Sequence, residues 1–441
     1  MVIVFVLVAL IVLAVLALGH WYVWRRLVRD TTRGPGPARR AGTAVFVAGP
    51  VLMVAALVAE RAGAPFWLQR TLAWPGFLWT ALALYLLLAV VAGEVVRPLL
   101  RRALERGTRE PLPERTPVPT PTPAAPAPPE RTAPAAPERA APASPEPDTT
   151  PTPPEPDAAR TSVPSAAPTR RLFVSRVVGG AAATAAVATV GYGTYGVLRG
   201  PRVKRVTVPL AKLPRAAHGF RIAVVSDIHL GPILGRDFAQ KVVDTVNATQ
   251  PDLIAVVGDL VDGSVKDLGP AAAPLARLTA RHGAYFVTGN HEYFSGAEQW
   301  VAEVRTLGLH PLENARTELP YFNLAGVNDL QGESEGQGPD FGKALGDRDP
   351  ARACVLLAHQ PVQIHEAVRH GVDLQLSGHT HGGQLWPGNL IAAAANPTVA
   401  GLERYGDTQL YVSRGAGAWG PPTRVGAPSD VTVIELAATR A

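Results

Sequence analysis

The sequence predicts an α/β domain in which helices cover a largely buried system of sheets, preceded by a helical membrane region. Two observations lead to this fold class. Apolar residues are concentrated before position 100, in uncharged runs long enough to cross a bilayer. After position 200, short β-branched apolar runs alternate with amphipathic stretches, which is the pattern of strands followed by helices.

The composition narrows the class of protein. Hydrophobic residues make up 47% of the chain and the mean hydropathy is +0.11, which is high for a soluble enzyme. The net charge is +6, but the arginines that supply it flank apolar segments, so they indicate membrane topology and we expect no nucleic-acid partner. The single cysteine, Cys354, excludes a framework of disulfides within the chain and is typical of a small core residue.

Three apolar runs, at residues 2–18, 44–59 and 74–96, predict three transmembrane helices within residues 1–106. Their flanks differ in charge. Six arginines follow the first run and four follow the third, whereas the loop between the second and third runs has two. The positive-inside rule therefore places the N-terminus outside the cell, and places the first loop and the segment after the third run in the cytoplasm.

Residues 107–169 predict a disordered linker rich in proline and alanine. About twenty prolines stand here among alanine, glutamate, threonine and serine. Such a segment cannot bury enough apolar surface to fold, and its prolines stiffen it toward an extended form. We expect it to act as a spacer.

Residues 170–200 have two interpretations. Arg170 and Arg171 are followed by Leu172-Phe173 and then by a weakly apolar run at 177–198. The first interpretation is a fourth transmembrane helix with a basic flank. The second is a resemblance to a twin-arginine export signal that is retained as an anchor, although such signals normally open a chain. Both interpretations place the two arginines inside and the residues after Gly200 outside.

Residues 201–441 predict a single domain of alternating strands and helices. We expect strands at 221–226, 253–257, 285–287, 321–327, 353–358, 374–376, 410–413 and 431–436. We expect helices at 237–248, 271–278, 297–307 and 362–369. In folds of this kind, ligands gather where the carboxyl ends of strands meet the loops.

Five short polar motifs each follow one of these apolar strand runs. They are Asp227-Ile228-His229, Gly258-Asp259, Gly289-Asn290-His291-Glu292, His359 and Gly378-His379-Thr380-His381. Stability alone does not require polar side chains at the end of strand after strand. A two-metal centre does require them, because its ligands must converge from several strand ends onto one point.

The spacing within the first motifs suggests roles for individual residues. Asp227 and His229 are two residues apart, so in extended backbone they point the same way and can chelate one ion. Asp259 can bridge two ions through its two oxygens, and we expect Asp262 to cap or hydrogen-bond the loop rather than bind a metal directly. Asn290 offers a carbonyl oxygen to a hard or borderline metal.

The later histidines divide into candidate ligands and one residue that faces substrate. His291 adjoins Asn290, and neighbouring side chains diverge in an extended chain, so we expect His291 to face the substrate rather than share the metal. His359 ends a buried strand. His379 and His381 are again two apart, so we expect them to face the same way, in a glycine-rich turn where backbone comes close to a ligand.

The whole motif set, over residues 206–436, resembles the calcineurin-like metallophosphoesterase superfamily. The Gly-Gly-Gln that follows His381, together with segments 413–415 and 422–424, resembles its membrane-anchored, twin-arginine-exported phosphodiesterase branch. The resemblance implies a four-layer αββα sandwich, with two sheets inside and helices outside. It implies that one metal is held by Asp227, His229, Asp259 and His381, and the other by Asp259, Asn290, His359 and His379. It also implies that His291 is the catalytic acid that protonates the leaving oxygen.

The ligands determine the chemistry that we expect. All are oxygen or nitrogen donors without a thiolate, which suits two divalent ions of manganese, iron or zinc. We predict a membrane-anchored phosphohydrolase of the cell membrane, multi-pass and with an extracytoplasmic catalytic domain. We expect a phosphodiesterase that attacks cell-envelope phosphodiesters or pyrophosphates with a metal-bridging hydroxide, the substrate being linked to lipid or cell wall.

Two other functions stay open at this stage. One is a phosphomonoesterase or phosphoprotein phosphatase, and the other is a catalytically idle membrane scaffold. The complete set of ligands argues against the scaffold. We expect substrate specificity to lie in loops 326–352 and 386–405, which contain no motif that identifies a substrate.

Overall fold

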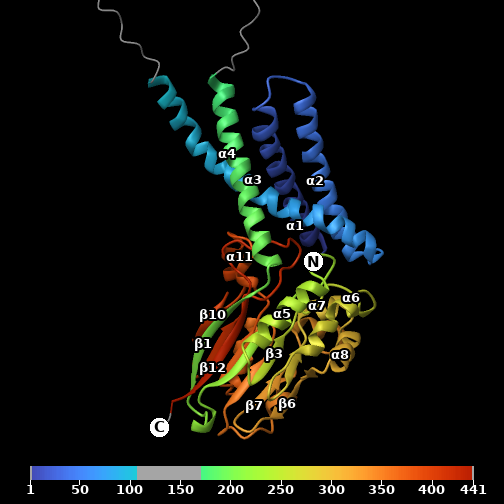
Figure 1. Ribbon diagram of the computed structural model, residues 1–441, viewed down its shortest axis with the longest axis vertical. Helices are drawn as coiled ribbons and strands as arrows, with labels where there is room; N and C mark the ends of the chain where they lie inside the picture. Colours follow the sequence, from blue (N-terminus) through green and yellow to red (C-terminus); the bar gives the residue numbers. More distant parts are fainter. Residues whose placement is uncertain (1, 107–169, 440–441) are drawn as a thin grey trace, which may run out of the picture.

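The computed structural model describes residues 2–106 and 170–439 (Figure 1). The predicted linker, residues 107–169, lies outside the described residues. The described chain forms an elongated molecule in which a group of long helices stands on one end of a sandwich of sheets (Figure 1).

Four helices precede the sandwich, and each contains a stretch long and apolar enough to cross a membrane. They are α1 (Val2–Trp24), α2 (Pro37–Arg61), α3 (Phe66–Arg106) and α4 (Arg170–Leu198). Each helix extends past the apolar run that predicted it, because polar and basic flanks continue the helical hydrogen bonding. The helix α2, for example, begins at Pro37, where a missing backbone N–H costs nothing.

The sandwich consists of two six-stranded sheets. The first has the order β1 (Arg202–Leu210), β12 (Asp430–Ala438), β2 (Phe220–Val225), β3 (Leu253–Val257), β4 (Ala284–Val287) and β5 (His310–Pro311). The second has the order β10 (Gly401–Tyr405), β11 (Thr408–Val412), β9 (Leu374–Ser377), β8 (Cys354–Leu357), β7 (Asn323–Gly326) and β6 (Ala315–Glu318). Strands β2, β3 and β4 are parallel, as are β7, β8 and β9.

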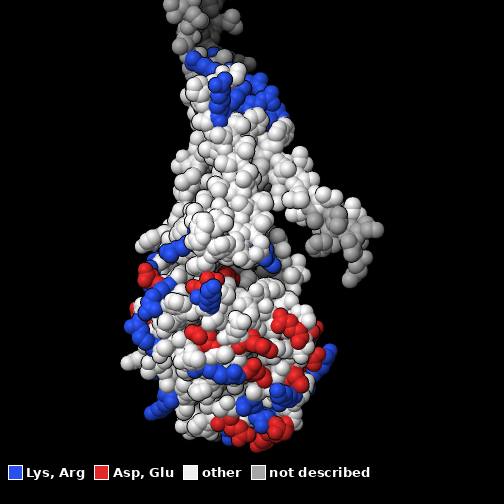
Figure 2. Space-filling view, turned by 90° about the vertical axis from the view of Figure 1, so that its right-hand side faces the viewer, with Lys and Arg blue, Asp and Glu red and all other residues white. Residues whose placement is uncertain are grey.

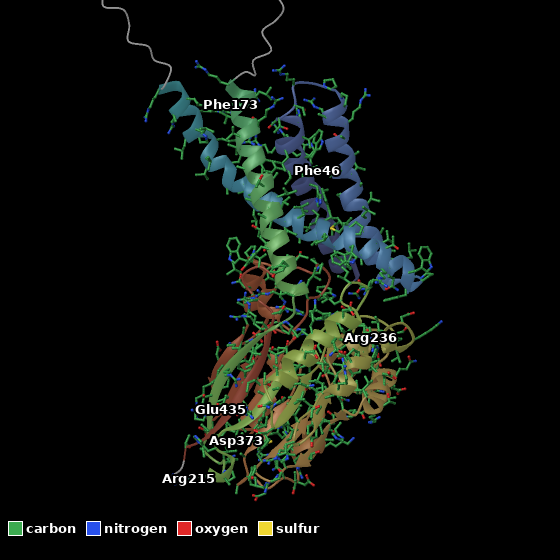
Figure 3. All side chains as sticks on the ribbon, in the orientation of Figure 1. Phe46, Phe173, Arg215, Arg236, Asp373 and Glu435 are labelled. Atoms are coloured by element: carbon green, nitrogen blue, oxygen red, sulfur yellow. The ribbon has the colours of Figure 1, made fainter. Side chains whose placement is uncertain are left out.

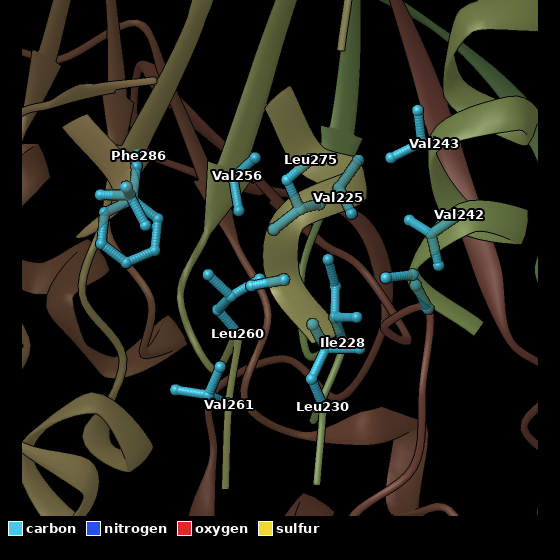
Figure 4. Close-up of a cluster of buried hydrophobic side chains, with 14 of the residues drawn as sticks. Val225, Ile228, Leu230, Val242, Val243, Val256, Leu260, Val261, Leu275 and Phe286 are labelled. Atoms are coloured by element: carbon cyan, nitrogen blue, oxygen red, sulfur yellow. The ribbon is translucent and has the colours of Figure 1, made fainter. Parts of the chain in front are cut away.

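Seven helices belong to the sandwich. They are α5 (Arg236–Ala248), α6 (Val265–Ala272), α7 (Asn290–Ser295), α8 (Ala297–Thr306), α9 (Phe341–Leu345), α10 (Ile364–Arg369) and α11 (Gly388–Ala395). Helices α5, α6 and α8 contribute to an apolar cluster on the outer face of the first sheet. Figure 4 shows part of this cluster, with Val242 and Val243 of α5. Helices α9 and α10 contribute to a second cluster on the outer face of the other sheet.

The alternation of side chains along the central strands assigns the four layers. In β2 and β3, Ala223, Val225 and Val256 join the outer cluster with α5, whereas Ile222 and Val257 join a cluster between the sheets. Because both faces of these strands are buried, the runs are apolar throughout rather than alternating. The predicted four-layer αββα sandwich behind an apolar helical region is thereby confirmed.

Several elements differ from the prediction. Strand β1 was not expected, because its basic residues Arg202, Lys204 and Arg205 suggest a membrane flank; instead it pairs in parallel with β12. Strands β5, β6 and β10 are short or exposed and were also missed. The helix expected at 271–278 is divided into α6 and a 3₁₀ turn, because Ser264 caps an earlier start and Pro274 cannot donate a helical hydrogen bond.

The helical region packs directly on the sandwich. Tyr85 of α3 donates a hydrogen bond to the carbonyl of Trp386, 2.9 Å away. In α4, Thr194 and Thr423 bring their hydroxyl oxygens to 2.7 Å. Because these loop residues follow β9 and β11, the helices lie over the end of the sandwich where the parallel strands finish.

Candidate metal centre

All eight side chains predicted for the site converge at one end of the two sheets. Asp227 and His229 follow β2, Asp259 follows β3, Asn290 and His291 follow β4, His359 follows β8, and His379 and His381 follow β9. Parallel strands finish at the same edge of their sheet, so residues far apart in sequence meet there. The sequence-based expectation that these motifs lie together is therefore met by the geometry.

The backbone at these residues is not extended, as the prediction assumed. Asp227, His229, Asp259, His379 and His381 have φ between 50° and 72°, in the left-handed region. That conformation is costly for residues with a side chain and is concentrated at functional sites. The residues therefore reach the centre through tight left-handed turns at the strand ends, and the same-face argument for Asp227 and His229 was wrong.

The argument that His291 diverges from Asn290 in an extended chain was wrong as well. Asn290 and His291 do not lie in extended chain but begin helix α7, which is capped at Gly289. A side chain at Gly289 would collide with the carboxylate of Asp259, so glycine is required by this close approach. The backbone N–H of His291 donates to Oδ1 of Asp259, 2.9 Å away, and this bond ties the start of α7 to the centre.

The seven candidate ligands form two adjoining groups, and His229 and Asp259 also lie close enough to His291 to make a third possible set of ligands. In the first, Nε2 of His381 lies 2.9 Å from Nε2 of His229 and 3.3 Å from Oδ1 of Asp227. In the second, Nε2 of His359 lies 3.2 Å from Oδ2 of Asp259. The two groups adjoin, since Nε2 of His229 lies 3.7 Å from the same oxygen of Asp259.

His379 and Asn290 complete the second group. Nδ1 of His379 lies 3.0 Å from Oδ1 of Asn290, and one ligand atom each of Asp259, His359 and His379 lie within 4.8 Å of one another. His379 and His381 therefore serve different groups, although they are two residues apart. Both residues have left-handed backbone, with φ of 72° and 52°, and Thr380 between them is right-handed, so the expectation from extended chain that they face the same way does not apply.

These donors fit divalent ions on two observations. Several pairs of donor atoms lie 2.9–3.3 Å apart, close enough for both atoms to bind one ion. The Nδ1–H of His359 donates to the carbonyl of Val257 at 2.9 Å, so its buried Nε2 carries a lone pair without a hydrogen-bond partner. That lone pair faces a carboxylate oxygen of Asp259, and a cation between the two atoms resolves the repulsion.

Burial sets the protonation of the histidines in the two groups. Burial lowers the pKa of His379 to about 4, and the neighbouring His359 lowers it further. Burial and the neighbouring His229 lower the pKa of His381 well below its usual value. Both rings are therefore neutral near pH 7, which is the form that binds metals.

Asp262 has a role that the sequence did not suggest. Its Oδ1 lies 2.9 Å from Nδ1 of His229 and 2.6 Å from Nδ1 of His291, so it orients two imidazoles rather than its own loop. Burial alone would lower the pKa of His291, but the Asp262 carboxylate raises it to about 9. Burial opposes ionisation of Asp262 as well, yet the two histidines hold its pKa well below the ordinary range.

Two further polar residues organise the site and were given no role in the prediction. The buried carboxylate of Glu292 accepts hydrogen bonds from the backbone N–H groups of Asp259, Leu260 and Gly289 at 2.6–2.9 Å. Burial and the neighbouring Asp259 raise the pKa of Glu292 to about 7. Its position three residues after Gly289, as in a capping box, is the signal that could have identified it.

Arg424 is the other such residue. Its guanidinium is buried, lies 2.9 Å from Nδ1 of His381 and donates to the carbonyls of His381, Gly417 and Ala427. Burial lowers its pKa to about 10. Arg424 lies in segment 422–424, which was part of the basis for the family resemblance. The resemblance did not indicate a role for this residue.

Comparisons with known proteins agree with this geometry. A family model described as calcineurin-like phosphoesterase matches residues 220–383, which include every motif of the centre. An uncharacterized metallophosphoesterase of Helicobacter pylori (strain J99) is 38% identical over 256 residues, covering 57% of this chain and 68% of that protein. The chain belongs to the calcineurin-like phosphoesterase family.

Other similar proteins include membrane proteins. This chain is 39% identical over 260 residues to a transmembrane protein with metallophosphoesterase domain of Danio rerio. That match covers 56% of this chain and 59% of the relative, so the chain spans about three fifths of the relative's length. Among solved structures, a dimetal phosphatase from Danio rerio aligns with 12% identity and a TM-score of 0.34, covering 48% of this chain and 91% of that one.

Membership of the calcineurin-like phosphoesterase family identifies the class of reaction. The matched domain is that of a metal-dependent phosphoester hydrolase, and the clusters of histidine and aspartate are suited to a divalent-metal site. The family model begins after α4, so the four apolar helices are additional to the domain that it matches.

Proposed function

We propose that the centre holds two divalent ions, of manganese, iron or zinc. Asp227, His229, Asp259 and His381 would hold one ion, and Asp259, Asn290, His359 and His379 would hold the other. The observation that carries this proposal is the position of Asp259 between the two groups, with Oδ2 3.2 Å from His359 and 3.7 Å from His229. When bound, two such ions supply Lewis acidity to a phosphoryl group and activate water at neutral pH.

The protein's own residues supply the proton that the leaving group takes up. Because Asp262 engages Nδ1 of His291, the other ring nitrogen is free to meet the substrate. The carboxylate also favours the protonated ring, so His291 donates a proton from Nε2 to the departing oxygen. Asp262 holds the ring in the tautomer and orientation that this transfer requires.

We infer further that the enzyme is a membrane-anchored phosphodiesterase of the cell envelope. The four apolar helices support the anchor, and their contact with the end of the sandwich that carries the centre supports a substrate at the membrane. At a membrane, the compounds that phosphoester hydrolysis can act on are phosphodiesters and pyrophosphates linked to lipid or cell wall. On this proposal the chain divides into residues 1–106, 107–169, 170–200 and 201–441.

The distribution of charge supports an extracytoplasmic catalytic domain. Lysine and arginine gather at the end of the helices that is far from the sandwich, and the surface between is almost free of charge (Figure 2). By the positive-inside rule, the arginine-rich end is cytoplasmic. The sandwich would then lie on the outer side, in agreement with either interpretation of Arg170 and Arg171.

The experiment that tests this function uses the full-length chain in detergent, reconstituted with manganese, iron or zinc. We expect about two ions per chain and loss of activity on chelation. Bis(p-nitrophenyl) phosphate should be hydrolysed faster than p-nitrophenyl phosphate. A metal content near zero would contradict the two-ion centre, and a preference for the monoester would favour a phosphomonoesterase or phosphoprotein phosphatase instead.

A further inference from the structure

A cavity of about 490 Å³ separates the metal centre from the loop that joins α2 to α3. The loop side, which we call the hairpin (residues 60–69), contributes Glu60, Arg61, Gly63, Ala64, Phe66 and Gln69. The opposite wall includes Asp262, His291 and Phe294. Small-molecule sites have volumes of about 300–1,000 Å³, so this cavity is large enough to hold part of a substrate whose phosphate lies at the centre.

The hairpin is held against the sandwich by apolar contacts. Phe66 packs against the cluster on the outer face of the first sheet. Ala56, Ala73 and Phe77 form a small cluster with Ile233, which lies in the loop just after Asp227 and His229. Apolar packing, as in the core, therefore fixes the position of the hairpin wall of the cavity.

Glu60 lines two cavities that also border the catalytic groups. It lines the large cavity with Asp262 and His291, and it also lines a neighbouring small cavity with Asp262 and His229. Its carboxyl interacts electrostatically with all three of these residues and with the adjacent Arg61. Within residues 2–106 and 170–439, no hydrogen bond or ion pair engages that carboxyl.

A partly buried carboxylate beside a second carboxylate is unfavourable unless a donor meets it. Phosphate oxygens cannot be that donor, because a carboxylate repels them. The alcohol portion of a phosphoester can supply one, as a hydroxyl or an ammonium group. Glu60 is therefore suited to the group that the phosphate esterifies, and not to the phosphate itself.

The hairpin joins two helices that are apolar enough to cross a membrane, so the cavity lies at the end of the helical region next to the sandwich. Aromatic side chains are enriched where membrane meets water. Trp67 of the hairpin is 68% exposed and Phe294 across the cavity is 54% exposed, with the guanidinium of Arg61 5.5 Å from the Phe294 ring centroid. This wall of the site thus faces the depth at which lipid headgroups lie.

We propose that Glu60 is a substrate-binding residue, which accepts hydrogen bonds from the hydroxyl or ammonium group of a membrane lipid's phosphodiester headgroup. The proposal rests on the phosphodiesterase function proposed above and names its substrate class. It also gives the helical region a role beyond anchoring, because the helices complete the active site. Specificity then resides in the hairpin and not only in loops 326–352 and 386–405.

The test uses the full-length chain, loaded with manganese, in nanodiscs of phosphatidylcholine. The lipid substrates are phosphatidylglycerol and phosphatidylethanolamine, and glycerophosphoglycerol is the soluble counterpart. Bis(p-nitrophenyl) phosphate serves as a diester without donor groups. The variant is Glu60→Gln, and the matched control is Glu435→Gln, an exposed residue of β12 far from the helices (Figure 3).

We expect Glu60→Gln to lower kcat/KM on the preferred lipid by about 10- to 100-fold, the loss typical of a hydrogen bond to a charged group. Its metal content should match that of the wild type, and its loss of rate on bis(p-nitrophenyl) phosphate, which has no donor group for Glu60 to bind, should be smaller than its loss on the lipid. Glu435→Gln should match the wild type throughout. Binding of glycerophosphoglycerol to chelator-treated protein, where nothing is turned over, should weaken in Glu60→Gln alone.

The outcomes separate this proposal from the function on which it rests. If the wild type cleaves no diester at all, the phosphodiesterase function fails. If it cleaves bis(p-nitrophenyl) phosphate but neither lipid, or if Glu60→Gln equals the wild type on the lipids and in binding, the role of Glu60 is overturned. Cleavage of glycerophosphoglycerol as fast as phosphatidylglycerol would overturn the membrane source of the substrate.

Discussion

Oδ1 of Asp262 lies 2.6 Å from Nδ1 of His291, and this contact links the loop after β3 to the first turn of α7. The same oxygen lies 2.9 Å from Nδ1 of His229, a candidate metal ligand. One carboxylate therefore orients a ring on the metal side and a ring on the substrate side of the centre. This relationship makes Asp262 a positioning residue.

Replacing Asp262 by asparagine tests that role. Removal of the negative charge lowers the pKa of His291 from about 9, so the ring is protonated over a narrower range of pH. A general acid is active below its pKa and inactive above it, so the alkaline limb of the pH–rate profile should move to lower pH. We expect a fall in kcat of about 10- to 100-fold, as for other residues that orient a catalytic ring. An unmoved alkaline limb would exclude this role.

His291→Ala should keep both metals but slow turnover by about 10²- to 10⁴-fold, since it removes the proposed general acid. The deficit should shrink on diesters with very acidic leaving groups, because such groups depart without a proton. The measurement is a series of aryl phosphodiesters with leaving groups of graded pKa. An equal deficit across the series would remove His291 from the role of acid.

Asp259→Ala should be more damaging than any other single change among the seven candidate ligands. Asp259 lies between the two groups, so its loss removes a ligand from both ions at once. Metal analysis of the purified variants provides the comparison. We expect less than one ion per chain in Asp259→Ala, against about one in His381→Ala or His379→Ala, where only one group is affected. Retention of two ions in Asp259→Ala would contradict the bridge.

Cys354 should resist alkylation in the folded protein. Burial raises the pKa of its thiol to about 11, so the thiolate that reacts with iodoacetamide is scarce at pH 8. Mass spectrometry should show labelling only after the protein is unfolded in denaturant. Rapid labelling under native conditions would mean that β8 opens locally, because Cys354 is fully buried in that strand.

Arg170→Lys/Arg171→Lys tests the export signal. The double variant keeps the charge, so the positive-inside rule predicts no change in topology. A receptor that recognises the two arginines would fail to export it. On the twin-arginine interpretation, external protease should digest the sandwich domain of the wild type but not that of the variant.

The remaining outcomes of that protease experiment decide between the other topologies. Equal digestion of both proteins would leave α4 as an ordinary fourth transmembrane helix. Protection of both would place the catalytic domain in the cytoplasm and contradict the proposed orientation. Cells opened with detergent provide the control that the domain is cleavable.

The sequence by itself determined the chemistry of the site and most of the elements that carry it. Apolar runs at the lengths of strands and membrane helices are local signals, because each element buries its own residues. Polar motifs at strand ends are local as well, and Asp227, His229 and Asp259 could be named without any contact between them. The four-layer order followed only from the resemblance to a family.

Tertiary structure alone decided which groups meet. Nothing in the local sequence indicates that Asp262 engages both His229 and His291, or that Arg424 lies against His381 43 residues away. Glu60 reaches the centre only because apolar helices pack on the sandwich, although some 200 residues separate it from Asp262. The left-handed turns at the ligands were also invisible, since long-range contacts stabilise them. Such contacts depend on how whole elements pack, which no short stretch of sequence specifies.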